Sequence, residues 1–133
     1  MALIFICSCI KYRLFYLSLQ SEIVKKNKTA IMIVFNTTFH VDEAIQDDFI
    51  EYMLQEFIPM ATKSGLLTYP RLAKIFGKEE DDGLSFAMEF QVADIVAMEK
   101  WNAEESNIVY APLMERFKEK LIGFSTLMQT IDY

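Results

Sequence analysis

The stretch that most constrains the fold is MIVFNTTFHV, residues 32–41, which is rich in β-branched and aromatic residues. Because side chains in a strand point to opposite faces at every second residue, this stretch would carry two distinct faces. One face would hold Ile33, Phe35, Thr37 and Phe39. The other would hold Val34, Asn36, Thr38 and His40, the only histidine of the chain. The alternation predicts a strand with one face in a core and one partly polar face.

Length, composition and charge limit the classes of protein to which this chain can belong. The chain has 133 residues, 53% of them hydrophobic and 24% charged, which indicates one packed globular domain. The net charge of −6 is unevenly placed: residues 1–31 have a balance of +4, so residues 32–133 carry −10. A domain with that charge repels phosphate backbones, and no expected element carries a stripe of Lys or Arg. We therefore expect no nucleic-acid partner.

The first 31 residues have a different composition from the rest. A membrane span is not expected, because Lys11 and Arg13 interrupt the apolar run before the roughly 18 residues that a span requires. A secretory signal is poorly matched, since no positive residue precedes the apolar core and no small-x-small site follows cleanly. Ile, Phe, Tyr, Lys and Asn dominate, as in A/T-rich untranslated sequence read as codons. We expect a misplaced start, with true initiation at Met32 and residues 1–31 outside the fold.

Both cysteines lie in this leader, at positions 7 and 9, too close to the N-terminus for a lipoprotein signal. Residues 32–133 therefore have no disulfide, no thiolate nucleophile and no sulfur ligand for a metal. Without disulfides or a convincing export signal, the expected compartment is the cytoplasm.

Two helices are predicted after the first strand. Apolar residues recur at a spacing of four between residues 42 and 64, which predicts a helix buried along one stripe, bent by Pro59 and closed by Gly65 in a left-handed cap. Asp94 is a good N-cap for a second helix, with Trp101 on its core face. This helix is expected in two pieces, the second with Pro112 in its first turn.

Three more strands complete the pattern. Residues 69–76 predict an edge strand, because Pro70 cannot donate to a central ladder. Residues 84–91 alternate apolar and polar side chains most clearly, and residues 121–131 predict the last strand. The resulting β-α-β-β-α-β order favours a ferredoxin-like α+β fold, a four-stranded antiparallel sheet with both helices on one face. Right-handed crossovers put the first and third strands in the centre.

The side of the sheet away from the helices, which we call the open face, is where we expect function. The expected members come from three strands: Val34, Asn36, Thr38 and His40; Ser85, Ala87, Glu89 and Gln91; and Gly123, Ser125, Leu127 and Gln129. In residues 71–76, both alternating sets of side chains mix apolar and polar residues. The sequence therefore does not decide on which face of the sheet Arg71 lies.

The segments MIVFNTTFHVDEAIQDDFIEYML, PRLAKIF and EKLIGFSTLMQTIDY resemble a family of small bacterial proteins known only as a domain of unknown function. The resemblance covers residues 32–133. The fold is also similar to the dimeric α+β barrel group, in which two ferredoxin-like protomers pack sheet against sheet. That group includes cofactor-free monooxygenases, haem-degrading enzymes, lactone isomerases and ligand-sensing modules. The resemblance brings no catalytic residues, so catalytic positions stay unknown.

Few residues suggest chemistry. His40 would titrate near neutral pH but has no relay partner in sequence, and a histidine at a strand end is often a structural residue. Glu89, if covered by a second protomer, must be paired, hydrogen-bonded or protonated, and Arg71 is its candidate partner. One histidine without cysteine argues against a metal site, and no cofactor motif is present.

Two function classes therefore remain. We favour a homodimeric ligand-binding or interaction module that uses the open face, with a possible small-molecule ligand. The alternative is a cofactor-free small-molecule enzyme, monooxygenase- or isomerase-like, acting in the same cleft; fold cannot decide between them. The candidate cleft residues are Asn36, Thr38, His40, Ser85, Glu89 and Ser125.

Overall fold

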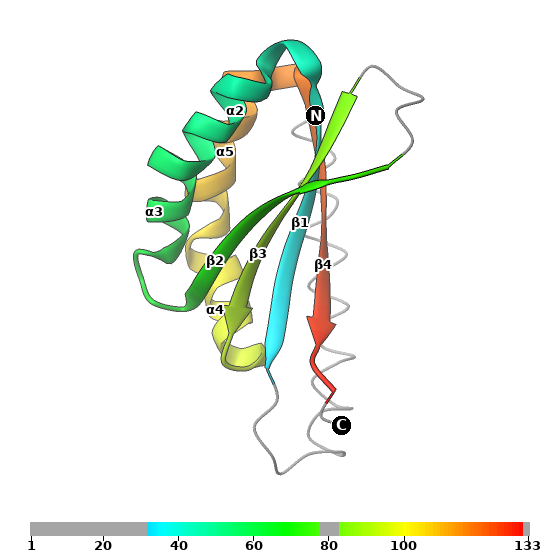
Figure 1. Ribbon diagram of the computed structural model, residues 1–133. Coiled ribbons are helices and arrows are strands. Elements are labelled where there is room, and N and C mark those ends of the chain that lie inside the picture. The colour runs from blue at the N-terminus through cyan, green and yellow to red at the C-terminus, as the bar shows by residue number, and fades with distance from the viewer. Residues whose placement is uncertain (1–31, 78–82, 132–133) are drawn as a thin grey trace.

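The structure, a computed structural model, describes residues 32–77 and 83–131 of the chain. The elements follow the expected βαββαβ order (Figure 1). The strands are β1 (Ile33–Asp42), β2 (Leu67–Ile75), β3 (Gly83–Val92) and β4 (Leu121–Gln129). The helical segments are η1 (Glu43–Ile45), α2 (Gln46–Tyr52), η2 (Met53–Phe57), α3 (Ile58–Thr62), α4 (Ile95–Glu104), α5 (Ser106–Phe117) and η3 (Lys118–Lys120).

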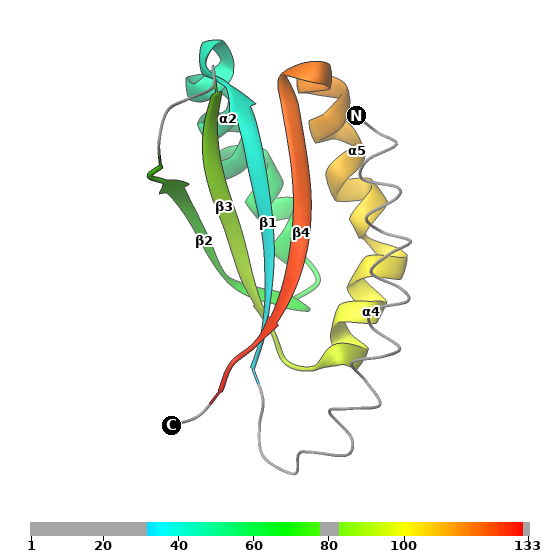
Figure 2. The ribbon, with the colours of Figure 1, turned by 90° about the vertical axis from the view of Figure 1, so that its right-hand side faces the viewer.

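The four strands form one antiparallel sheet in the order β2-β3-β1-β4. The first and third strands are therefore central and the other two are edges, as predicted. The helices lie on one side of this sheet (Figure 1). Figure 2 looks onto the opposite side, where the strands face the viewer and α2 lies behind them. The chain thus has the α+β ferredoxin-like arrangement that the sequence predicted.

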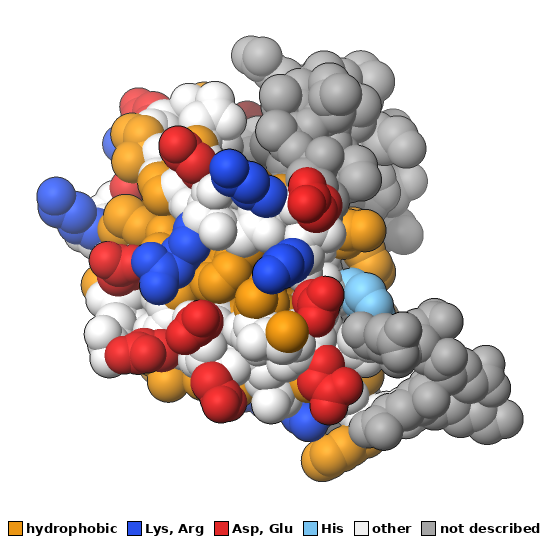
Figure 3. All heavy atoms as spheres, turned by 90° about the horizontal axis from the view of Figure 1, so that it is seen from above, with side chains coloured by type: hydrophobic (Ala, Val, Ile, Leu, Met, Phe, Trp, Pro, Cys, Tyr) orange, Lys and Arg blue, Asp and Glu red, His pale blue; other side chains and the backbone are white. Residues whose placement is uncertain are grey.

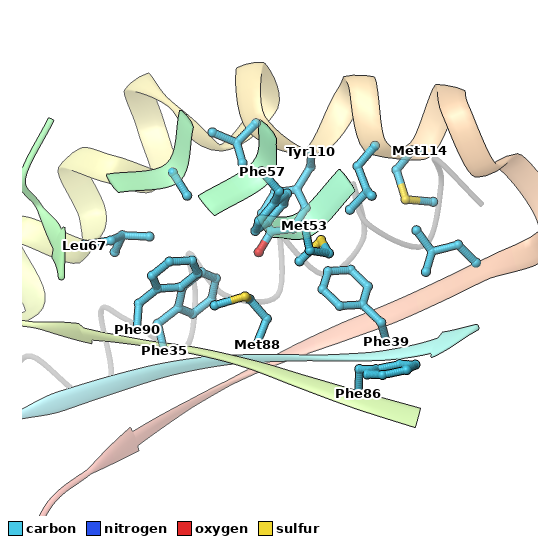
Figure 4. Close-up of a cluster of buried hydrophobic side chains, with 14 of the residues drawn as sticks. Phe35, Phe39, Met53, Phe57, Leu67, Phe86, Met88, Phe90, Tyr110 and Met114 are labelled. Carbon is cyan, nitrogen blue, oxygen red and sulfur yellow. The ribbon is translucent and has the colours of Figure 1, made fainter. Parts of the chain in front are cut away.

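Aromatic side chains fill the space between the two layers. Phe39 of β1 is fully buried and contacts Phe49 and Phe57 edge to face, with ring centroids 5.5 and 6.2 Å apart. Phe57 also contacts Tyr110 of α5 at 5.5 Å, so β1, the first helical stretch and α5 meet at one cluster (Figure 4). The expected core position of Trp101 is confirmed, because it is 1% exposed and its Nε1 donates to the carbonyl oxygen of Ala61 at 3.0 Å.

The first helical stretch is not one regular helix. Asp42 caps it, since its carboxylate accepts from the backbone N–H of Ala44 at 2.9 Å. A π-helical turn, η2, ends directly before the segment that contains Pro59. Pro59 has no backbone N–H and its ring crowds the preceding turn, which accounts for the wider turn there. Gly65 adopts the expected left-handed conformation, with φ +81°.

The second helical stretch has the two predicted pieces, separated at Glu105. Asp94 caps α4 by accepting from the N–H of Ala97 at 2.8 Å. The expectation for Pro112 was wrong, because this residue lies inside α5 and not in its first turn. The helix already begins at Ser106, whose hydroxyl donates to the carbonyl oxygen of Asn102 and links the two pieces at 2.6 Å.

Candidate functional site

The register of the strands defines the open face. On β1 and β3 the predicted faces are confirmed, because Phe35, Phe39, Phe86 and Phe90 are buried toward the helices. The open face consists of one set of side chains from each strand. Its members are Thr68, Arg71, Ala73 and Ile75 of β2; Ser85, Ala87, Glu89 and Gln91 of β3; Val34, Asn36, Thr38 and His40 of β1; and Ile122, Phe124, Thr126 and Met128 of β4.

The predicted face of β4 was wrong, and Ser125 is therefore not an open-face residue. Register pairs Ser125 with Thr37, and their hydroxyl oxygens lie 2.9 Å apart on the helix side of the sheet. Leu127 is likewise buried against the helices. Gly123 is buried opposite Phe39. In exchange the open face gains an exposed apolar stripe, Ile122, Phe124 and Met128.

The structure shows on which face of the sheet Arg71 of β2 lies, which the sequence did not decide. A bulge lies between Thr68 and Arg71, with Tyr69 in a left-handed conformation at φ 49°. After the bulge Arg71 stands opposite Glu89 on the open face and forms an ion pair with it. Its Nε and Nη2 both donate to the same carboxylate oxygen, Oε2, the former at 3.1 Å. Glu89 is therefore paired within its own chain.

His40 stands at one end of the open face. Its Nδ1 lies 3.4 Å from the hydroxyl oxygen of Ser85, its register partner on β3. The ring covers the backbone of Gly83, where an added Cβ would come within 2.3 Å of Nε2. Figure 3 shows this end of the molecule, with the single histidine in pale blue and acidic and basic side chains interspersed around it.

Asn36 lies near the middle of the central strand and behaves differently from the other polar residues of the face. It is 9% exposed, and its Nδ2 donates to the hydroxyl oxygen of Thr38 at 3.1 Å. Its Oδ1 is buried and accepts no hydrogen bond from any described residue. Register places Asn36 directly opposite Glu89 on one side and Thr126 on the other.

The structure keeps His40 and Glu89 on the same face but does not bring them together. Glu89 stands opposite Asn36, four residues along β1 from His40. At roughly 3.3 Å per residue this separation is about 13 Å, too far for a direct contact. Of the candidate residues, Asn36, Thr38 and Glu89 form a central group, His40 and Ser85 an end group, and Ser125 lies on the helix side.

The sequence did not predict a hollow on the surface of the helical layer. A groove of about 530 Å³ there is lined by Tyr52, Gln55, Glu56, Pro59, Met60, Pro112 and Arg116. The guanidinium of Arg116 lies over the Tyr52 ring, 5.4 Å from its centroid. Burial and the nearby Glu56 carboxylate raise the pKa of Tyr52, while Arg116 acts in the opposite direction. Residues far apart in sequence build this groove, so local pattern could not find it.

Within residues 32–77 and 83–131, no group of three or more His, Cys, Asp or Glu side chains is placed to hold a metal ion. Over the same ranges, no helix has the length and apolar character needed to cross a membrane.

The model of a family described as a domain of unknown function, DUF4286, matches residues 32–131. No curated protein sequence matches the chain.

Several solved structures share the fold. One is a dimeric ferredoxin-like protein from an uncultured marine organism, with 14% identity, a TM-score of 0.53 and coverage of 79% of this chain and 99% of that one. Another is an ethyl tert-butyl ether degradation (EthD) family protein from Bacillus halodurans, with 16% identity, a TM-score of 0.54 and coverage of 76% and 99%. A third, from Bacillus cereus, is described provisionally as an antibiotic biosynthesis monooxygenase, with 10% identity, a TM-score of 0.50 and coverage of 77% and 95%. At these identities the likeness concerns the fold alone.

Proposed function

We propose that this chain, which belongs to the DUF4286 family, acts as a homodimer through the open face of its sheet and binds a small molecule between the two sheets. The observation that carries the proposal is the apolar stripe of β4. Ile122, Phe124 and Met128 are 42, 56 and 41% exposed on one face. Solvent-facing apolar stripes of this kind mark interaction surfaces.

The rest of the face suits a partner of the same kind. Between the β4 stripe and Ile75 on the opposite edge, the central positions are small or neutral, including Ala87, Thr38 and Val34. The ion pair of Arg71 with Glu89 is internal to the chain, so covering it leaves neither of these two charges unpaired. A two-fold axis can pair such a patch with itself. The dimeric ferredoxin-like protein with the same fold supports this assembly.

A binding module is favoured over an enzyme because the polar side chains of the face are mostly engaged. Glu89 is held by Arg71, and His40 lies by Ser85 with no carboxylate bonded to its ring among the described residues. A general base needs a proton to abstract within hydrogen-bond reach and an orienting partner. The proposal includes the cytoplasm as compartment, since residues 32–133 contain no cysteine.

The second candidate is a cofactor-free small-molecule enzyme in the same cleft. His40 favours it, because an exposed imidazole lies at the end of the open face and histidine is the side chain most often used as a general base. The fold shared with the provisionally described monooxygenase is consistent with it. Turnover of a bound compound that is lost in His40→Ala, with binding retained, would favour the enzyme over the module.

The dimer is tested by sedimentation equilibrium on a matched pair of variants. Phe124 on the open face and Leu54 on the helical layer are both 56% exposed. Phe124→Glu should convert the dimer to monomer, because it buries an unpaired charge in each half of the interface. Leu54→Glu adds the same charge at the same exposure and should stay dimeric. A stable pairing should bury about 1,200 Å² or more. A native chain that is monomeric at micromolar concentration would overturn the proposal.

A further inference from the structure

We infer that the outer edge of β4 pairs antiparallel with the same edge of another copy of this chain, about a two-fold axis at Ser125. The pairing joins two of the proposed face-to-face dimers into a dimer of dimers. It uses the strand edge and not the open face, so it adds a second interface that goes beyond the proposed function. The groups that recognise the partner are backbone N–H and C=O groups.

The first step is a difference between the two edges of the sheet. An edge strand can pair with a strand of another chain, and proteins prevent this with prolines, bulges and charged side chains on the edge. The β2 edge has all three protections, since it contains a bulge, Pro70 and the charged Lys74. The other edge, β4, has none of them from Leu121 to Gln129. β4 is therefore the edge that is open to pairing.

The second step is the direction of the backbone groups of β4. The N–H of Thr130 donates to the carbonyl oxygen of the opposite residue, Met32, at 2.9 Å. Hydrogen-bonded pairs alternate with non-bonded pairs along an antiparallel ladder, so the backbone groups of Gly123, Ser125 and Leu127 point away from β1. Among the described residues, none forms a hydrogen bond with these outward groups. They have the alternating spacing that a further antiparallel strand requires.

The third step is the fit of β4 to itself. A two-fold axis at Ser125, the middle residue of Leu121–Gln129, pairs the whole strand and bonds outward groups only to outward groups. This register sets Ile122 beside the partner's Met128 on the side of the open face. The two Phe124 side chains lie diagonally across the axis, within reach of each other. The exposed apolar stripes of two copies thus become one continuous surface.

The fourth step is charge. Residues 32–133 carry a strong net negative charge, so two copies repel each other at long range. β4 itself has no charged side chain from Leu121 to Gln129, so no like charges meet along the paired strands. Lys118 and Lys120, which precede the strand, come to opposite ends of an antiparallel pair. This edge therefore permits the pairing of two acidic copies.

Hydrogen exchange followed by NMR on the full-length native chain tests the pairing at single amides. One strand edge buries less area than a whole sheet face, so we expect tetramers to form from dimers only as the protein concentration rises. Sedimentation equilibrium locates this concentration range. Across it, the outward amides of Gly123, Ser125 and Leu127 should come to exchange about tenfold more slowly, because they become hydrogen-bonded. The amides of the β2 edge are the control and should show no dependence on concentration.

A mixed sample of isotope-labelled and unlabelled chains identifies the register without any substitution. The two-fold axis at Ser125 makes Phe124 and the partner's Thr126 a non-hydrogen-bonded pair, whose Cα atoms lie about 4.5 Å apart. An isotope-filtered NOE should therefore connect the Cα–H groups of these two residues across the interface.

A matched pair of variants isolates the central N–H group. Ser125→Pro removes the outward N–H, and proline is tolerated on an edge strand where the N–H does not bond to the sheet. Ser125→Ala keeps that N–H, and both variants lose the hydroxyl that contacts Thr37. Ser125→Pro should stay dimeric at concentrations where Ser125→Ala forms tetramers. Far-UV circular dichroism checks that both variants fold, and the exchange and NOE measurements on the native chain decide the matter if Ser125→Pro does not.

The outcomes separate this inference from the proposed function. A native chain that stays dimeric at every concentration, with fast exchange at the outward amides of β4, overturns the edge pairing and leaves the face-to-face dimer standing. A dimer that gives the NOE and becomes monomeric in Ser125→Pro supports the edge pairing and overturns the face-to-face dimer. Slow exchange that does not depend on concentration overturns the second copy as the partner. A native chain that is monomeric throughout overturns both interfaces.

Discussion

The hydroxyl groups of Thr37 and Tyr110 lie 2.8 Å apart in the core and join the central strand β1 to helix α5. The same Thr37 oxygen lies 2.9 Å from the hydroxyl of Ser125, so one threonine links an edge strand, a central strand and a helix. Thr37 is 1% exposed, and such a buried group is tolerated because it is hydrogen-bonded. The only polar position on the buried face of β1 is thus a junction between the two layers.

The first prediction concerns this junction. Thr37→Val keeps the shape of the side chain but removes its hydroxyl, and with it the contacts to the hydroxyls of Tyr110 and Ser125. We expect the free energy of unfolding to fall by about 1–3 kcal/mol, measured by urea denaturation. The control, Thr126→Val on the exposed side of β4, should change it by no more than about 0.5 kcal/mol. Equal effects in the two variants would show that the network adds no stability.

The sequence predicted which face of a strand is buried where only one of its two alternating sets of side chains carries the large apolar residues. In β1 and β3 the aromatic residues, such as Phe35 and Phe90, all fall on one parity, so the open face of these strands followed directly. In β4 both parities carry large apolar residues, and the sequence assigned Phe124 to the core instead of Leu127. The register decides, because it places Gly123, Ser125 and Leu127 opposite the buried residues Phe39, Thr37 and Phe35 of β1. That is a tertiary relationship which no local pattern contains.

Other parts of the site depended on similar non-local facts. Arg71 reaches the open face because the bulge at Tyr69 adds one residue to β2 and shifts its parity. The unfilled oxygen of Asn36 could not be found in the sequence either, since it depends on which neighbours bury the amide. The sequence placed Asn36 on the right face but could not distinguish it from Thr38.

The second prediction concerns Gly83 and His40. Gly83→Ala places a methyl group within 2.3 Å of the His40 Nε2 position, so the imidazole must turn away from Ser85. The ring is the end of an exposed side chain and can move cheaply, so we expect the melting temperature to change by no more than a few degrees. The imidazole resonances of His40 should shift in NMR spectra. Unchanged resonances would mean that the ring does not cover Gly83 in solution.

The third prediction separates binding from stability on the open face. The Arg71–Glu89 pair is partly exposed, so Glu89→Gln should cost at most about 1 kcal/mol, and His40→Ala should be similarly mild. Glu89→Gln should nevertheless weaken ligand binding by the dimer, because Glu89 belongs to the central polar group of the open face, whereas His40→Ala alters only the end group. Lost stability with unchanged binding in Glu89→Gln would assign Glu89 a structural role only.

The fourth prediction concerns the leader, residues 1–31, which lie outside the described residues. A chain that begins at Met32 contains the whole of the family match and every strand of the sheet. We expect it to reproduce the far-UV circular dichroism and melting temperature of the full chain within error. A large loss of stability on truncation would show that the leader packs on the domain.

The last prediction is a pH dependence that originates in the groove between the helices. Burial, and then the Glu56 carboxylate, raise the pKa of Tyr52 in the folded state above its ordinary value of 10.0. The folded state therefore holds the phenolic proton more tightly than the unfolded state does. This contribution to stability is fully present below pH 10 and is lost as the pH rises through the folded pKa.

Tyr52→Phe has no proton to lose at this position, so it tests that sign directly. Between pH 9 and about 11, the free energy of unfolding of the native chain should fall more steeply than that of the variant, measured by urea denaturation at each pH. Arg116→Leu provides the control, because the guanidinium over the Tyr52 ring lowers its pKa. Removing it should raise the pKa of Tyr52 further and extend the decline to higher pH. Parallel curves for the native chain and Tyr52→Phe would contradict the raised pKa.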